Sequence, residues 1–280
     1  MQFKTVSKEV FKSCLGEQLV YANFNLREDI ARYLNDLRYG VCRMEEKRVV
    51  DVFIENAGIA RSENRALCQD TGYVQVYMSV GNRVFLDFDI QQTVNEVVSE
   101  VYKKFALRQS LADPVTRVNT RDNTPAFIDT EIVEGDTLDV WIMIKGGGSE
   151  NVSGAGLLLP TAAMEDVSKW AVGVIAQAGS KACPPYLIGV CVGGTLAKAV
   201  SVSKRLLLEY IDQNTMNKVE NEISVSILKN ANKLSVGFQG LKFGDTIIAA
   251  KVKTIPCHIA TLPVAVSIGC NSIRQGYFRI

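Results

Sequence analysis

The residues best able to do chemistry gather in five short segments that are rich in glycine, proline, cysteine and small polar side chains. The segments are LCQDTG (67–72), KGGGSEN (145–151), ACPP (182–185), CHIATLP (257–263) and GCNSIR (269–274). Residues of these types stop strands, and loops held by a rigid scaffold are where binding and catalytic sites are usually built. We therefore expect these segments to supply the thiols and polar groups of a site.

The run of three glycines at 146–148 removes every side chain from a stretch of backbone. This permits the close approach of a ligand and leaves amide N–H groups able to bind an anion. A plain turn is the competing interpretation. The chain contains neither a P-loop nor a dinucleotide-binding glycine pattern, so the glycines do not indicate a nucleotide site.

The chain has seven cysteines, and their spacing fits no common metal or disulfide motif. They are Cys14, Cys42, Cys68, Cys183, Cys191, Cys257 and Cys270. An odd number without a secretion signal argues against a disulfide framework. No pair forms the C-x-x-C of a zinc ribbon or a ferredoxin loop. Because free cysteine is usually a small buried hydrophobe, residue type alone does not select the metal ligands.

Composition limits the possible partners of the protein. The 280 residues include 31 lysines and arginines against 30 aspartates and glutamates, so the chain has no general attraction for nucleic acid or an anionic membrane. No apolar run reaches the roughly 18–20 residues that span a bilayer, and the start lacks a secretion signal. We expect a cytoplasmic protein, in which an anionic substrate would need locally placed cations.

Hydrophobic periodicity predicts the elements that must position these segments. The first 65 residues read as helical, with apolar residues three and four apart over 24–37 and 43–60. Further helices are predicted over 91–105, 162–178 and 196–210. Strands are predicted over 73–78, 138–145, 186–192, 247–253 and 264–268.

Helices and strands that do not alternate regularly indicate an α+β fold, and we expect mainly antiparallel strands. No shift of composition marks a linker. We therefore predict one domain over residues 1–280, with a helical N-terminal part over 1–65.

Six motifs, in order, resemble one family from about residue 67 to the C-terminus. They are C-Q-D-T-G (68–72), R-x-N-T-x-D-N-T-P (117–125), K-G-G-G-S-E-N (145–151), C-P-P followed by G-V-x-x-G-G-T (183–195), H-I-A-x-L-P-V-A-V (258–266), and a final cysteine at 270. The chain resembles the N-terminal iron–sulfur domain of class I fumarate hydratases and the alpha subunits of L-tartrate dehydratases.

The resemblance implies a [4Fe–4S] cluster held by Cys68, Cys183 and Cys270. Three thiolates on four irons leave one iron without a protein ligand. An open metal position can bind a substrate oxygen and act as a Lewis acid. Structural and electron-transfer clusters usually have four protein ligands, so three ligands favour catalysis.

The resemblance also assigns roles to five other residues. Asp70 is expected to hydrogen-bond a catalytic hydroxyl or proton carrier, although a turn-capping carboxylate is an equal alternative. His258 is expected in the active site, against the alternative of a structural hydrogen bond. Gln69, Arg108 and the Gly147 amide are expected to bind substrate, with Arg108 clamping a carboxylate.

Other residues are left open or depart from the family pattern. Cys191 is predicted to be a buried strand residue, and the roles of Cys257 and Arg274 stay open. Many fumarases have histidine directly after the last cluster cysteine, but this chain has Asn271. That departure weakens the inference of an identical substrate.

These features predict the alpha subunit of a hydro-lyase that interconverts fumarate and (S)-malate. L-tartrate dehydration to oxaloacetate is the nearest alternative, and mesaconate hydration a further one. A different class of protein, a non-catalytic iron–sulfur sensor subunit or a structural protein with buried thiols, is also considered. Because the second domain of single-chain relatives is missing, we expect a separate beta subunit in an alpha/beta hetero-oligomer with an alpha–alpha contact.

Overall fold

The computed structural model describes residues 3–40 and 43–280, so Cys42 lies outside the described residues. The chain forms two compact units, each built from separate stretches of sequence. The first unit consists of Met1–Arg27, Glu55–Gly147 and Ile273–Ile280, and the second of Glu28–Ile54 and Gly148–Ser272. Because the units interleave along the chain, no single linker separates them. The expectation of one domain stays a prediction.

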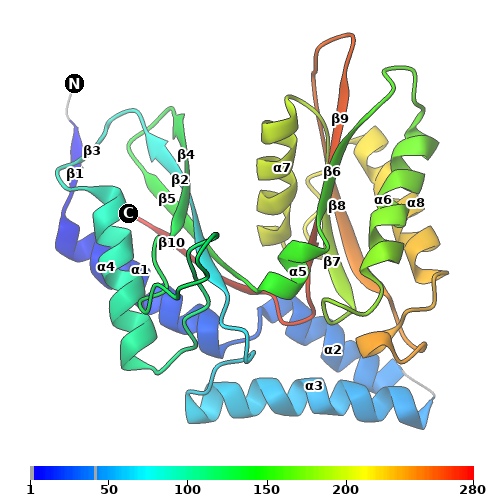
Figure 1. Ribbon diagram of the computed structural model, residues 1–280, viewed down its shortest axis with the longest axis horizontal. Helices are drawn as coiled ribbons and strands as arrows, with labels where there is room; N and C mark the ends of the chain where they lie inside the picture. The colour runs from blue at the N-terminus through cyan, green and yellow to red at the C-terminus, as the bar shows by residue number, and fades with distance from the viewer. Residues whose placement is uncertain (1–2, 41–42) are drawn as a thin grey trace. The chain divides into compact units, whose positions relative to one another are not determined.

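The first unit contains a four-stranded sheet in the order β10-β5-β2-β4 (Figure 1). Its strands are β2 (Tyr73–Gly81), β4 (Phe127–Val133), β5 (Leu138–Lys145) and β10 (Arg274–Arg279). β2 runs parallel to β4 and antiparallel to β5, which is itself antiparallel to β10. A small parallel pair joins β1 (Lys4–Val6) to β3 (Val84–Leu86).

Helices α1 (Lys8–Phe24) and α4 (Ile90–Lys104) pack against this sheet in one hydrophobic core. On β2, alternate residues such as Val74 and Val76 are fully buried in that core, as the two-residue period of a strand requires. Gln75, on the other face, donates a hydrogen bond to Asp129. The sheet therefore has an apolar face under the helices and an opposite face that mixes polar residues such as Gln75 with Trp141 and Met143.

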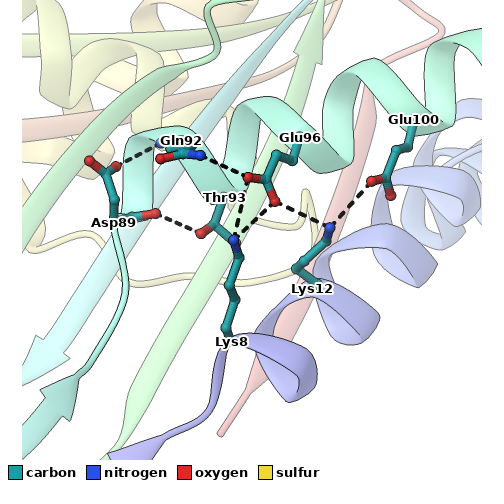
Figure 2. Close-up of polar contacts among 7 residues, drawn as sticks. All are labelled: Lys8, Lys12, Asp89, Gln92, Thr93, Glu96 and Glu100. Atoms are coloured by element: carbon teal, nitrogen blue, oxygen red, sulfur yellow. Dashed lines mark hydrogen bonds and ion pairs between the residues drawn. The ribbon is translucent and has the colours of Figure 1, made fainter.

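Ion pairs hold α1 to α4 along their exposed edges (Figure 2). Lys8 lies 3.1 Å from Glu96, and Lys12 lies 3.3 Å from Glu96 and 3.2 Å from Glu100. Asp89 caps α4, because its side chain accepts the amide hydrogen of Gln92. These ion pairs orient α4 on α1, and α4 leads directly into the segment 105–126.

The second unit contains a four-stranded sheet in the order β6-β9-β7-β8. Its strands are β6 (Gly154–Leu158), β7 (Tyr186–Gly193), β8 (Ile247–Ile255) and β9 (Leu262–Gly269). β7 is parallel to β8 and antiparallel to β9, and β6 is antiparallel to β9. Helices α6 (Met164–Ala178) and α8 (Lys218–Asn232) cover one face, and α7 (Leu196–Arg205) covers the other (Figure 1).

Strand β7 shows why both faces of this sheet are covered. Ile188 and Val190 pack in the core with α6 and α8, while Cys191 packs beside Ala199 of α7. At Gly189 a β-carbon would lie 2.0 Å from the carbonyl oxygen of Ser203. Glycine at 189 therefore lets α7 lie directly on the strand.

The remaining helices are α2 (Glu28–Gly40), α3 (Met44–Glu63), the short α5 (Gly147–Asn151), and 3-10 turns at Leu206–Leu208 and Phe238–Gly240. α2 belongs to the second unit, and α3 contributes residues to both units. Among the helices of residues 3–40 and 43–280, none combines the length and apolar character that a bilayer crossing requires.

The α+β class is confirmed, and every predicted helix and strand overlaps an observed element of the same type. The sheets are more mixed than expected, because β2-β4, β7-β8 and β1-β3 are parallel pairs. Sequence reasoning missed β1, β3, β4, β6, β10, α5 and α8. The missed strands are short or lie at a sheet edge, where exposed and buried residues mix and the apolar signal is weak.

Candidate active site

The C-Q-D-T-G segment, at residues 68–72, enters β2 of the first unit and is held by its backbone carbonyls. Three successive carbonyls, those of residues 70–72, each accept a hydrogen bond from a buried side chain. In chain order the donors are Arg274 at 2.7 Å, Tyr102 at 2.6 Å and Asn123 at 3.1 Å. All three donors are at most 1% exposed. The segment is therefore fixed from β10, from α4 and from the 105–126 connection at once.

The carboxylate of Asp70 is held by two backbone amides. Its Oδ1 accepts the amide hydrogen of Gly72 at 3.0 Å, and its Oδ2 accepts that of Gly147 at 2.9 Å. The first contact is the turn-capping interaction that was weighed against a catalytic role. The second engages the amide that was expected to face substrate. The carboxylate is thus aligned by two charge-assisted hydrogen bonds.

Arg108 lies beside the same segment. The hydroxyl of Thr71 donates to the backbone carbonyl of Arg108, which follows α4. The side chains of Arg108 and Gln69 are exposed, while Cys68 and Asp70 are partly buried. The first unit therefore joins, through hydrogen bonds, the segments that carry five of the predicted site residues. They are Cys68, Gln69, Asp70, Arg108 and Gly147.

Gly72 has a backbone reason to be glycine. Its φ is +61°, and a β-carbon there would lie 2.3 Å from the carbonyl oxygen of Lys145 at the end of β5. Only glycine allows the start of β2 to approach the end of β5 so closely. The triple glycine and the C-Q-D-T-G segment are consequently neighbours.

The second unit brings together two of the three predicted cluster ligands. Asn271 donates its backbone amide hydrogen to the Cys183 carbonyl at 3.2 Å, and its side-chain amide donates to the Pro184 carbonyl at 3.3 Å. Asn271 directly follows Cys270. Both cysteine loops are therefore tied to each other by the residue that departs from the family pattern.

Tyr186 anchors the loop that carries Cys183. Its hydroxyl donates to the Gly179 carbonyl at 2.8 Å and accepts the amide hydrogen of Ala182 at 3.3 Å. Burial raises the pKa of Tyr186 to about 12, and negative charge on Cys183 and Cys270 acts in the same direction. Both sulfur groups therefore lie within electrostatic range of one hydroxyl.

The thiols of the chain differ in what they can do. Cys191 is fully buried, as predicted, and burial raises its pKa to about 11. Cys183 is instead exposed, with a φ of +57°, and Cys270 is partly exposed. Cys257 is also exposed, so it is not a packed core thiol. Thiols that are not needed for packing, carried on neighbouring loops, are suitable ligands for an iron–sulfur cluster.

The three predicted ligands divide between the units, since Cys68 belongs to the first and the other two to the second. Neither unit by itself carries the complete set. In the part of the chain that the structure describes, no three histidine, cysteine, aspartate or glutamate side chains are grouped so that they could hold a metal ion. The exposed thiols of the second unit fit a cluster chemically, and the assignment of the three ligands stays a prediction.

His258 lies in the tight connection between β8 and β9. It is exposed, and its Nδ1 accepts the amide hydrogen of Ala260 at 3.1 Å. Strand β9 starts beside this connection and ends one residue before Cys270. The eight residues of β9 make seven steps of about 3.4 Å, so the two ends of the strand lie roughly 24 Å apart. Within the second unit, His258 is therefore not brought to Cys183 and Cys270.

A family model described as fumarate hydratase (Fumerase) matches residues 13–279. The chain belongs to this fumarate hydratase family. The match starts well before the first motif, so the family includes the N-terminal helices as well as the motif-bearing segments.

Named relatives cover nearly the whole chain. A protein of Methanocaldococcus jannaschii, which carries the provisional name L(+)-tartrate dehydratase subunit alpha, is 30% identical over 100% of this chain and 98% of its own length. The L(+)-tartrate dehydratase alpha subunit of Escherichia coli K12 is 27% identical over 92% of this chain and 88% of its own length. The corresponding subunit of strain UTI89 is 27% identical over 93% and 89%.

Some residues that support the fumarate hydratase family motifs were not found from the sequence. Tyr102 lies on the core face of α4, where an aromatic residue reads as packing. Arg274 was left open, although it contacts the backbone of Asp70. The side chain of Asn123, inside the 117–125 motif, bridges the Gly72 carbonyl and the Ser110 amide. A polar residue inside a family motif was the available signal for Asn123.

Proposed function

We propose that this chain is the alpha subunit of a [4Fe–4S] hydro-lyase that acts on a small dicarboxylate, with fumarate and (S)-malate as the leading substrate pair. The observation that carries the proposal is the contact of Asp70 with Gly147, together with that of Thr71 with Arg108. These contacts join the backbone segments that carry Cys68, Asp70 and Arg108 within one unit of a fumarate hydratase family member.

Cys68, Cys183 and Cys270 are the residues proposed to hold the cluster. When bound, a cluster with one open iron supplies a Lewis acid that assists departure of a poor leaving group. The neighbouring residues of the chain bind and orient the substrate. The Arg108 guanidinium can form two parallel hydrogen bonds with a carboxylate, and Gln69 can donate another.

Asp70 is proposed to hold or move a proton. Its carboxylate is already fixed by two amides, so little reorganisation is needed when a substrate hydroxyl or proton carrier binds. Substrate approach to the Gly147 amide requires sharing that amide with Asp70. The role of His258 stays a prediction. Because Nδ1 accepts a backbone hydrogen, its ring offers an Nε2–H donor.

A separate beta subunit is proposed to complete the site. Relatives that match over nearly their whole length are named as alpha subunits, which supports an alpha/beta hetero-oligomer. We retain the predicted alpha–alpha contact and a cytoplasmic location as parts of the proposal.

L(+)-tartrate dehydration is the second candidate, favoured by the names of the relatives. The substrates differ by one hydroxyl, and a site that hydrogen-bonds that group can discriminate strongly. The test is the ratio of kcat/KM for fumarate, L(+)-tartrate and mesaconate, measured on the anaerobic complex with the beta subunit. The alpha chain alone is the control and should turn over poorly.

A preference for fumarate supports the leading substrate, and a preference for tartrate supports the second candidate. A cluster-loaded complex that dehydrates or hydrates none of the three would overturn the hydro-lyase proposal. It would favour a non-catalytic sensor subunit.

A further inference from the structure

Arg274 is a buried cation in contact with the backbone of the C-Q-D-T-G segment. It is the first residue of β10 and is 1% exposed. Its Nη2 donates to the Asp70 carbonyl at 2.7 Å. Its Nε and Nη1 find no hydrogen-bond partner among the described residues.

An anchoring role alone does not explain an arginine here. One backbone carbonyl can be satisfied by a neutral donor, such as the glutamine amide. Burial of a guanidinium with two unmatched N–H groups costs free energy that a neutral donor would avoid. Buried polar groups that lack partners call for a specific reason. The positive charge of Arg274 must therefore serve something nearby.

The electrostatic surroundings identify that neighbour. Burial raises the pKa of the Tyr102 hydroxyl, the charge of Arg274 opposes this shift, and the charge of Asp70 adds to it. The guanidinium and the Asp70 carboxylate thus act on the same buried hydroxyl. That hydroxyl donates to the Thr71 carbonyl, so all three groups hold a single turn.

We propose that Arg274 is a positioning residue of the site, whose buried positive charge keeps the Asp70 carboxylate between the amides of Gly72 and Gly147. It acts through Asp70 and contacts neither substrate nor cluster. The inference rests on the proposed function, because it gives Asp70 a role in turnover. It concerns the charge of Arg274 and not merely its contact with a carbonyl.

The test compares R274Q with R274K in the complete complex. Glutamine can still donate to the Asp70 carbonyl but lacks the charge, whereas lysine keeps both a donor and the charge. We expect R274Q to lose about 10–100-fold in kcat with little change in KM, and R274K to recover most of that loss. R27Q is the matched control. Arg27 is a buried arginine of the same unit, which donates to Gln275 at 3.2 Å.

Hydrogen exchange of the Gly72 amide gives a second readout that does not need turnover. That amide donates to Asp70 Oδ1, so its exchange should be about tenfold faster in R274Q and unchanged in R27Q. Should the wild-type complex show no hydro-lyase activity, the proposed function fails and this exchange result alone decides the positioning inference.

Wild-type kcat and wild-type exchange in folded R274Q would overturn the inference. An equal loss of kcat in R274Q and R274K would show that the charge is not what matters. If R274Q does not fold, the test is the kcat of R274K compared with that of D70N. A kcat in R274K as low as that of D70N would then contradict the inference.

Discussion

The Asp70 carboxylate lies directly over the backbone of Gly146. A β-carbon at Gly146 would stand 2.8 Å from Asp70 Oδ2 and 3.2 Å from its Cγ. The same Oδ2 accepts the amide hydrogen of Gly147. The triple glycine therefore leaves room for a carboxylate that grips the next amide, and this contact joins two family motifs far apart in sequence.

The change G146A should move the Asp70 carboxylate without substituting any charged residue. Because the added methyl would overlap Oδ2, the carboxylate must shift away from the Gly147 amide. We expect kcat to fall by about tenfold or more, as is typical when a supporting contact of a site is lost, with unchanged iron content. G58A is the control, since a β-carbon there meets nothing within 4 Å. Equal activity in G146A and wild type would contradict the proposed role of Asp70.

The change D70N tests the carboxylate itself. The Gly72 and Gly147 amides donate to different oxygens of Asp70, and asparagine replaces one of these oxygens with an NH2 donor that faces an amide N–H. The asparagine side chain also cannot carry a proton at neutral pH. We expect kcat to fall by about 10²–10⁴-fold while the cluster is retained. Steady-state kinetics beside an iron assay make the measurement. D87N, at an exposed aspartate of the same unit, should keep wild-type kcat. Activity in D70N near that of D87N would assign Asp70 to turn capping alone.

The absence of a side chain at Gly189 is needed for the packing of α7 on β7 in the second unit. A β-carbon there would lie 2.0 Å from the Ser203 carbonyl oxygen, so G189A must push α7 away from β7. Overpacking of this kind costs about 1–3 kcal/mol, and we expect a lower free energy of unfolding in denaturant titrations. G173A is the matched control, because this glycine of α6 has open space around it. Alanine there should stabilise by about 0.5–1 kcal/mol. The reverse order of the two variants would contradict this packing.

The α1–α4 ion pairs should make stability depend on pH and salt. Hydrogen bonds from Lys8 and then Lys12 hold the pKa of Glu96 below its usual range. A lowered pKa in the folded state contributes stability above the unfolded pKa, near 4.3, and loses it as the pH falls through the folded value. Stability should therefore fall more steeply below about pH 5 in wild type than in E96Q.

High salt should shrink the difference between wild type and E96Q at neutral pH, because exposed charges are screened. E134Q changes an exposed glutamate of the same unit and serves as the control. A pH dependence of E96Q identical to that of wild type would show that the pairs add nothing to stability.

The chemistry-bearing segments could be found from the sequence because residue type and order carry that information. The motif C-Q-D-T-G names Cys68, Gln69 and Asp70 directly. Long-range support could not be found in this way. Arg274 reaches Asp70 from 204 positions away, through the edge strand β10, whose pairing leaves little periodic signal.

A single strand separates two predicted site residues of the second unit. The resemblance placed both His258 and Cys270 in the site, and only 12 positions separate them in sequence. The intervening residues form the extended strand β9, and this carries the two residues to opposite ends of the sheet. Each residue in a strand adds about 3.4 Å, so residues close in sequence can lie far apart in space.

The central claim is that Cys68, Cys183 and Cys270 together hold one [4Fe–4S] cluster. Its most direct test is the iron and sulfide content of the anaerobically reconstituted complex, for wild type and for single serine variants of these cysteines. C257S, at an exposed cysteine outside the proposed set, is the control. We predict about four irons per chain in wild type and C257S, and loss of the intact cluster in C68S, C183S and C270S. A full complement of iron and sulfide in any of these three variants would contradict the account.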